Sequence, residues 1–305
     1  MFSRSALTRA FSAAARQQRV GFLGCGNMGQ SMALNLQKNG FAVKGYDVFE
    51  GARDAARDAG LTVVESIQEA VHDADFVVSA VPATAHVTEA MAGPGGVFEC
   101  APKGTLIMDS STILPAGSKL LVEGAEAVGM TFIDTPMSGG VMGALNGTLS
   151  FMCGGSEEAI ERARPVLNGM GKNIFHCGAA GQGLTAKLAN NLILGSNMIA
   201  LSEALSIGEK LGGDPNMLSD VYSVSTGKGF VVDTYSPVPN YREGTPASKG
   251  YNGGFMVKLL HKDLGLAVQA AADCGATLKE CPPNVAVYER MMELGLGDKD
   301  YSYVY

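Results

Sequence analysis

The stretch Arg19-Val-Gly-Phe-Leu-Gly24-Cys-Gly26-Asn-Met-Gly29 decides the fold of the first half of this 305-residue chain. Its apolar opening predicts a short buried strand, and its last three glycines have the spacing Gly-x-Gly-x-x-Gly. A helical pattern follows and stops at Asn39-Gly40, a usual helix end. A second strand is expected at 41–46, and Asp47 stands at its end. Strand, glycine turn, helix, strand and acid in this order predict a dinucleotide-binding unit.

Each residue of the glycine turn has a predicted role. Gly24 permits the tight turn, Gly26 lets the backbone approach a pyrophosphate, and Gly29 lets the helix pack closely on the strand. Asn27 and Met28 complete the turn and are expected to line the cofactor. The phosphates are expected at the helix N-terminus, where backbone N–H groups are free. The alternative is a tight strand–helix turn that binds no ligand.

Asp47 predicts which dinucleotide is bound. A carboxylate at this place accepts hydrogen bonds from the ribose hydroxyls of NAD and repels the 2′-phosphate of NADP. The next residues are Val48, Phe49 and Glu50, so no arginine follows directly to bind that phosphate. The sequence therefore favours NAD.

The alternation of strands and helices continues along the chain. Strands are expected at 75–81, 104–109, 130–134 and 173–177, with 148–155 also part of this domain, and helices at 50–59, 67–72, 84–91, 116–128 and 157–167. Such alternation predicts an α/β doubly wound parallel sheet of Rossmann type. Ligands bind beyond the carboxyl ends of such strands. Val81, Pro82, His86 and Thr112 fall there, so they are candidate cofactor contacts, with a plain loop as the alternative at each.

A glycine pair after the strand at 130–134 predicts a small-anion site. In Asp134-Thr-Pro-Met-Ser138-Gly139-Gly140, one hydroxyl and several backbone N–H groups are open to a ligand. Such a group suits a carboxylate. A simple glycine turn is the alternative.

After Gly183 the alternation stops, and the rest of the chain reads as helical. Helices are expected at 183–211, 215–223, 255–274 and 283–294, with a loop at 231–254. We therefore predict a nucleotide domain at 20–182 and an all-helical C-terminal domain at 183–305 for substrate binding and oligomerisation. Helical domains with few charges commonly pair with a copy of themselves, so a homodimer or homotetramer is expected.

The first of these helices carries an unusual polar stripe. In Gly183-Leu-Thr-Ala-Lys187-Leu-Ala-Asn-Asn191, residues four apart share one face, and the neighbouring faces are apolar. Lys187 and Asn191 therefore point into something enclosed, which predicts a catalytic amine with a polar helper. The alternative is a surface lysine whose stem lies along the helix.

Composition excludes several classes of function. The net charge of −7 argues against a nucleic-acid partner, and no apolar run is long enough to span a membrane. The six cysteines and four histidines are dispersed, so no metal site is expected. Residues 1–19 hold four arginines and several serines but no acid, which predicts a cleaved organelle transit peptide, with a disordered tail as the alternative.

Four separated motifs together resemble the β-hydroxyacid dehydrogenase family, and the resemblance covers residues 20–293. The motifs are Gly21-Phe-Leu-Gly-Cys-Gly-Asn-Met-Gly29, Asp134-Thr-Pro-Met-Ser-Gly-Gly140, Gly183-Leu-Thr-Ala-Lys-Leu-Ala-Asn-Asn191 and Lys262-Asp-Leu-Gly-Leu-Ala267. The resemblance implies that Lys187 is catalytic and that Ser138, Gly139 and Asn191 hold the substrate. It also implies that Val81, Pro82, His86, Thr112 and Lys262 line the cofactor.

The loop from Ser236-Pro-Val-Pro239 to Gly253-Gly-Phe255 resembles the branch of the family that acts on 3-hydroxyisobutyrate. This implies NAD-dependent oxidation of that acid to methylmalonate semialdehyde in the mitochondrial matrix. Two alternatives stay open. One is a relative that acts on tartronate, glyoxylate or succinate semialdehyde, and the other is an NAD-binding module without catalysis.

The chain departs from the family pattern at three positions. Thr135 and Met137 stand where alanine and valine are usual, and His86 stands where asparagine is usual. The first two change the bulk beside the expected carboxylate site. The third leaves the cofactor contact of His86 in doubt.

Overall fold

The computed structural model describes residues 17–305. The predicted leader at 1–19 therefore lies outside the described residues, except for its last three. Arg19 is already part of the fold, because it is the first residue of β1 (Arg19–Leu23) and its guanidinium pairs with Asp73 at 2.8 Å.

The first half of the chain alternates strands and helices, as the sequence predicted. Its strands are β1, β2 (Ala42–Tyr46), β3 (Phe76–Ser79), β4 (Leu106–Asp109), β5 (Thr131–Asp134), β6 (Met137–Ser138), β7 (Leu149–Gly154) and β8 (Gly171–Gly178). Its helices are α1 (Gly29–Lys38), α2 (Glu50–Asp58), α3 (Ile67–Val71), α4 (Thr84–Ala92), α5 (Val97–Cys100), α6 (Pro115–Ala127), α7 (Gly140–Asn146) and α8 (Glu157–Asn168). The sequence analysis missed α5, β6 and α7.

These strands form one sheet in the order β2-β1-β3-β4-β5-β7-β6, with β8 on β7. The first five strands are parallel, but β7 runs antiparallel to both β5 and β6. The prediction of an all-parallel sheet is therefore wrong for this edge, where the chain turns back directly after β6 and α7. The Rossmann-type classification is confirmed, with a mixed sheet.

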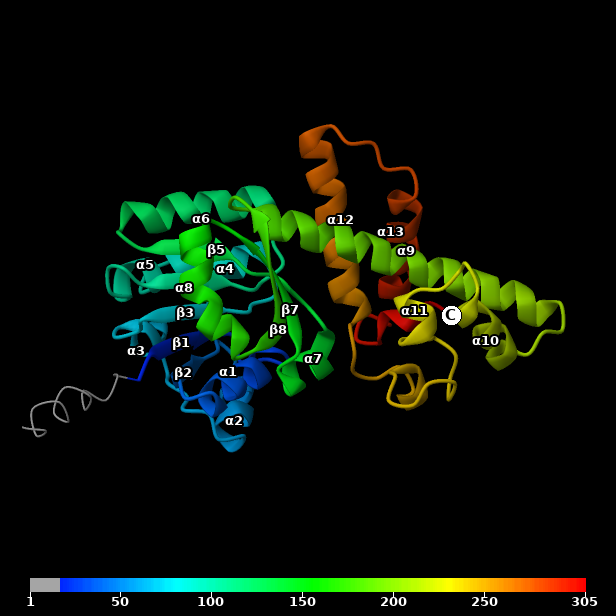
Figure 1. Ribbon diagram of the computed structural model, residues 1–305, viewed down its shortest axis with the longest axis horizontal. Coiled ribbons are helices and arrows are strands. Elements are labelled where there is room, and N and C mark those ends of the chain that lie inside the picture. The colour runs from blue at the N-terminus through cyan, green and yellow to red at the C-terminus, as the bar shows by residue number, and fades with distance from the viewer. Residues whose placement is uncertain (1–16) are drawn as a thin grey trace, which may run out of the picture.

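Helices cover both faces of the sheet (Figure 1). One core packs α1 and α8 against the sheet through Met32, Leu36 and Ile160. The other packs α4 and α6 through Met91 and Leu121. The central strands β3, β4 and β5 are nearly continuous apolar runs because both of their faces are buried, whereas β8 at the edge is largely exposed.

The second half is helical. It consists of α9 (Gln182–Lys210), α10 (Pro215–Val224), α11 (Phe230–Asp233), α12 (Val257–Cys274), α13 (Cys281–Glu293) and two short 3₁₀ segments, η1 (Ala247–Lys249) and η2 (Tyr301–Val304). The segment predicted as a loop at 231–254 contains most of α11 and all of η1. Within residues 17–305, none of the helices is long and apolar enough to cross a bilayer.

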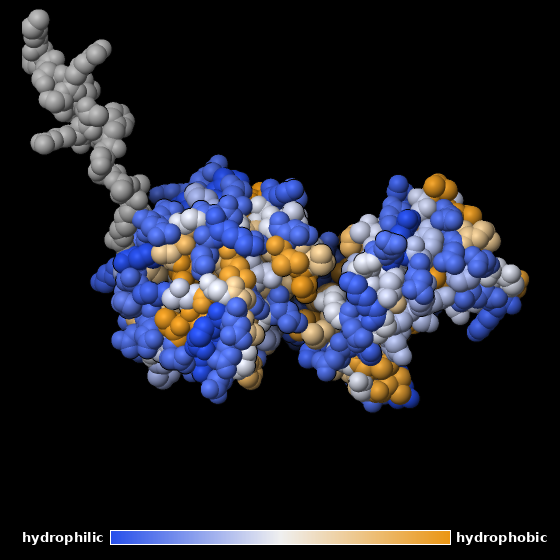
Figure 2. All heavy atoms as spheres, turned by 90° about the horizontal axis from the view of Figure 1, so that it is seen from below, coloured by the Kyte–Doolittle hydropathy of each residue, from blue (hydrophilic) through white to orange (hydrophobic). Residues whose placement is uncertain are grey.

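The helix α9 belongs to both halves of the molecule. It has 29 residues and is therefore about 44 Å long. Leu184 at its start is buried in a core of the nucleotide-binding half, whereas Met198 and Leu205 are buried in the helical half. Figure 1 shows α9 passing from one half to the other, with α12 crossing it. The space-filling view shows a notch between the two lobes (Figure 2).

Candidate active site

The glycine turn after β1 has room for a ligand at one of its three glycines. Gly24 has φ +95°, and a side chain there would collide with the carbonyl oxygen of Ala80. A side chain at Gly29 would collide with the carbonyl oxygen of Gly24. At Gly26, in contrast, an added Cβ meets no atom of residues 17–305 within 4 Å. The first and third glycines thus serve packing, and the second leaves open space where a pyrophosphate is expected.

The entrance to α1 is also suited to an anion. No side chain of residues 17–305 caps this helix at Met28, and of its first two N–H groups that of Gln30 donates to the carbonyl oxygen of Gly26 at 3.0 Å. Asn27 is exposed and Met28 half-buried beside this opening. The residues present therefore fit the diphosphate of a dinucleotide.

Asp47 follows β2 and lies against the glycine turn. Its two carboxylate oxygens accept backbone N–H groups from Cys25 at 2.8 Å and from Phe49 at 2.9 Å. Each carboxylate oxygen has a second lone pair, so further hydrogen bonds from ribose hydroxyls are possible. The sequence analysis missed Arg53, whose guanidinium donates to the carbonyl oxygen of Asp47 at 2.8 Å and pairs with Glu65 at 3.1 Å.

The loops after β3 and β4 are tied to each other and to the helical half. The backbone N–H of Val81 donates to the hydroxyl of Ser111 at 2.9 Å. Lys262, on α12, donates its ammonium to the carbonyl oxygens of Pro82 at 3.0 Å and of Thr112 at 2.8 Å. The structure therefore brings Val81, Pro82, Thr112 and Lys262 together. His86 lies on the exposed surface of α4 and forms no hydrogen bond with them within residues 17–305.

The predicted anion site lies at the start of α7. Ser138 ends β6, Gly139 precedes the helix with φ +129°, and Gly140 opens it with φ +61°. The hydroxyl of Ser138 is half-buried, and no described residue forms a hydrogen bond with it. An added Cβ at Gly140 meets no atom of the described residues within 4 Å, so the backbone is open to a ligand.

The polar stripe of α9 is buried. Only 9% of Lys187 and 1% of Asn191 are exposed. The amide of Asn191 donates to Asp263 of α12 at 2.6 Å, and its oxygen accepts from Asn190 at 3.2 Å. Asp263 in turn lies 3.1 Å from the ammonium of Lys262. The surface-lysine interpretation is wrong, because the side chain of Lys187 is enclosed.

The ammonium of Lys187 has neither a hydrogen bond nor an ion pair with any residue in the described part of the chain. Burial lowers its pKa from the ordinary value, the carboxylate of Asp263 opposes this, and the ammonium of Lys262 lowers it further. A buried amine with a lowered pKa and free donors is suited to exchange a proton with a bound oxygen.

The two charges beside Lys187 should move its titration in opposite directions. Asp263→Asn removes a charge that stabilises the ammonium, so the pKa of Lys187 falls and the acidic limb of the kcat/KM profile moves to lower pH. Lys262→Met removes a repelling charge, so that limb moves to higher pH. Profiles of both variants between pH 5 and about 10 test this, because general damage to the site would not displace the limb in opposite directions.

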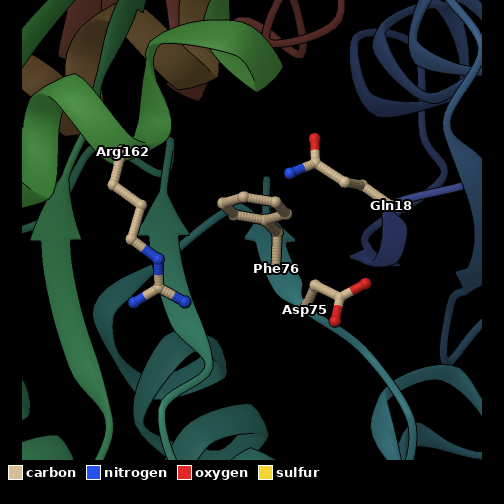
Figure 3. Close-up of a pocket in the computed structure, with 4 residues that line it drawn as sticks. All are labelled: Gln18, Asp75, Phe76 and Arg162. Carbon is tan, nitrogen blue, oxygen red and sulfur yellow. The ribbon is translucent and has the colours of Figure 1, made fainter. Parts of the chain in front are cut away.

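Two pockets in the described residues lie away from these groups. One cavity of about 310 Å³ is lined by Gln18, Asp75, Phe76 and Arg162 (Figure 3). It lies at the amino ends of the strands, away from α9, and the guanidinium of Arg162 covers the Phe76 ring at 5.8 Å. The described residues also include no group of three or more acidic, histidine or cysteine side chains placed to hold a metal ion.

Two family models together cover nearly all of the described chain. Residues 19–178 match the NAD-binding domain of 6-phosphogluconate dehydrogenase. Residues 181–305 match the NAD-binding domain of NADP-dependent 3-hydroxyisobutyrate dehydrogenase.

Individual proteins are similar over the same length. The mitochondrial 3-hydroxyisobutyrate dehydrogenase of Homo sapiens is 41% identical over 94% of this chain and 85% of its own. The NAD-dependent L-serine dehydrogenase of Pseudomonas aeruginosa is 37% identical over 94% of this chain and 96% of its own. The solved structure of Mycobacterium tuberculosis 3-hydroxyisobutyrate dehydrogenase with L-serine has a TM-score of 0.87 at 40% identity, over 94% and 98% of the two chains. The chain belongs to the 3-hydroxyisobutyrate dehydrogenase group of the β-hydroxyacid dehydrogenase family, whose members are NAD(P)-dependent oxidoreductases.

Proposed function

We propose that this protein oxidises 3-hydroxyisobutyrate to methylmalonate semialdehyde with NAD, and that Lys187 is its general acid and base. The observation that carries the proposal is the Lys187 side chain, which is buried beside Asn191 and Asp263 and whose ammonium has no hydrogen-bond partner among residues 17–305. A buried polar group is normally paired, so the free donors of Lys187 are reserved for a ligand oxygen.

Each residue of the site has a distinct part in this reaction. The hydroxyl of Ser138 and the backbone N–H groups of Gly139 and Gly140 hold the substrate carboxylate. Neutral Lys187 takes the proton of the substrate hydroxyl during oxidation and returns it during reduction. The amide of Asn191, which Asp263 fixes, orients the reacting oxygen. When bound, the nicotinamide supplies the hydride chemistry.

The substrate is tested by a screen with the purified protein. Oxidation of 3-hydroxyisobutyrate, L-serine and tartronate and reduction of glyoxylate and succinate semialdehyde are followed through NADH absorbance. We expect the largest kcat/KM for 3-hydroxyisobutyrate. L-serine is included because relatives at about 40% identity are named for it or were solved with it. A larger kcat/KM for another acid would replace the proposed substrate, and absence of turnover with all of them would favour a non-catalytic NAD-binding module.

We propose NAD rather than NADP as the cofactor, because Asp47 opposes a 2′-phosphate. Asp47→Ser should lower the ratio of kcat/KM for NAD over NADP by at least about tenfold, since a like-charge contact is lost while Arg53, bonded to the backbone carbonyl oxygen of residue 47, remains as a positive charge beside it. The double variant Asp47→Ser/Arg53→Ala is the control, and it should gain less activity with NADP. An unchanged ratio in Asp47→Ser would contradict the role of Asp47.

The remaining proposals concern assembly and location. Exposed apolar side chains include Ile207 on α9, Leu211 directly after it and Val224 on α10. They support a homodimer or homotetramer built on the helical half.

The arginine-rich leader and the mitochondrial relatives support import into the mitochondrial matrix. Light scattering and the N-terminal sequence of protein purified from its own cells test these two points.

A further inference from the structure

Asp134 is a fully buried carboxylate that neither the cofactor site nor the proton transfer uses. It is the last residue of β5 and is 0% exposed. It opens the segment that the sequence analysis assigned to substrate binding, but its side chain is directed elsewhere. Its oxygens accept from the backbone N–H of Gly181 at 2.6 Å, from that of Leu184 at 3.0 Å and from the hydroxyl of Ser118 at 3.2 Å.

These partners make Asp134 the cap of α9. The N-cap residue of this helix is Gly181, which has no side chain, and its φ of +86° is in the left-handed region. The first N–H groups of any helix need an acceptor from elsewhere. Here the acceptor comes from a strand 47 residues earlier in the chain. A carboxylate at this place is also stabilised by the positive end of the helix.

The same end of α9 packs directly on the sheet. An added Cβ at Gly183 would collide with the carbonyl oxygen of Met152 on β7 and would come within 2.8 Å of the Asp134 carboxylate. The first turn of α9 is therefore fixed between β5 and β7. Lys187 is three residues after Leu184, less than one turn along the helix, so its position depends on this contact.

We propose that Asp134 is a positioning residue for the reaction, which holds the start of α9 in register with the sheet and so places Lys187. This inference rests on the proposed role of Lys187. Misplacing a reacting group by about 1 Å can lower a rate by about 100-fold. Loss of the Asp134 cap should thus reduce turnover, although Asp134 touches neither substrate nor cofactor.

Asp109 provides a matched control within the same layer of the protein. It is the direct neighbour of Asp134 in the register of β4 and β5, and it is equally buried. Its carboxylate accepts from the hydroxyl of Ser79 at 2.7 Å and from the backbone N–H of Ser111 at 3.2 Å, and both residues lie at the ends of strands beside the cofactor site. One carboxylate therefore supports the cofactor loops, and its neighbour supports the catalytic helix.

The test compares Asp134→Asn with Asp109→Asn and Ser118→Ala. Asparagine is isosteric with aspartate, but its NH₂ group would face an N–H donor of Gly181 or Leu184, so one cap bond is lost. We expect Asp134→Asn to lower kcat by about 10–100-fold, with substrate KM and the NADH dissociation constant within about threefold of wild type. Asp109→Asn should instead weaken NADH binding with kcat at saturating cofactor nearly unchanged. Ser118→Ala leaves both helix donors in place and should stay within about threefold of wild type in kcat.

NADH binding is measured by fluorescence titration, which also gives the number of sites per chain. One full site per Asp134→Asn chain shows that the lowered kcat is not a loss of folded protein. If this variant is insoluble, Asp134→Ser, which keeps one acceptor oxygen, is used with the same expectation. A kcat within threefold of wild type at full NADH stoichiometry would overturn the proposal. The proposal would also be overturned if Asp134→Asn and Asp109→Asn changed kcat and the NADH dissociation constant by equal factors. Lys187→Ala is assayed in parallel, because normal turnover in that variant would refute the proposed function rather than the role of Asp134.

Discussion

Lys187→Ala is expected to lower kcat by about 10²–10⁴-fold, the usual contribution of a general acid or base. The variant lacks the only group proposed to exchange a proton with the substrate hydroxyl. NADH binding should change little, because the glycine turn and Asp47 belong to the other half of the molecule. Removing a buried ammonium also relieves its desolvation, so the variant should remain folded.

The measurement is steady-state oxidation of 3-hydroxyisobutyrate at saturating NAD, with NADH binding followed separately by fluorescence. Lys210→Ala is the matched control, since Lys210 lies at the exposed end of the same helix. This control should keep the kcat of the wild type. A Lys187→Ala variant with normal kcat would end the assignment of Lys187 as acid and base.

Gly26→Val is expected to weaken dinucleotide binding by at least about 100-fold, or about 2.7 kcal/mol, with the thermal midpoint of unfolding nearly unchanged. An added Cβ at Gly26 meets no atom within 4 Å in the part of the chain that the structure describes, so the side chain enters the space expected for the pyrophosphate. Isothermal titration with NADH and a melting curve give the two quantities.

Gly29→Ala separates packing from binding in the same turn. Its Cβ would collide with the carbonyl oxygen of Gly24, which cannot move without opening the turn. This variant should therefore lose about 1–3 kcal/mol of stability together with NADH affinity.

Tight NADH binding by Gly26→Val would show that the cofactor does not cross the turn at Gly26.

The elements of the first half could be predicted because their signals are local. The spacing of Gly24, Gly26 and Gly29 indicates the geometry of the turn, and the spacing of apolar residues indicates the strands. The reversal of β7 had no such signal. A strand has the same pattern of residues in either direction, and its partners β5 and β6 are set by tertiary contacts. The short helix α7 was hidden because its sequence begins with a glycine pair and reads as a turn.

The candidate site could be predicted where its residues lie on one face of one helix. It could not be predicted where residues of two separate elements form a contact. Lys187 and Asn191 are one turn apart on an apolar helix, which the spacing alone indicates. Asp263 bonds Asn191 across 72 residues of sequence, so no spacing rule connects them. The only sequence feature that pointed to Asp263 was its position directly after Lys262 in the motif Lys262-Asp-Leu-Gly-Leu-Ala267. Arg53 lies only six residues after Asp47, but its contact depends on how α2 packs beside the end of β2, which the spacing does not show.

The path of α9 through both cores also sets what kinds of genetic change the protein can tolerate. Leu184 is anchored in one core and Met198 in the other, and the helix between them has no break. Inserting or deleting a single residue there would rotate one half of the molecule against the other by roughly 100° and shift it by about 1.5 Å. Point substitutions on the exposed side of this segment leave both halves in place, whereas a change in its length would move Lys187 and the helical half relative to the nucleotide-binding half.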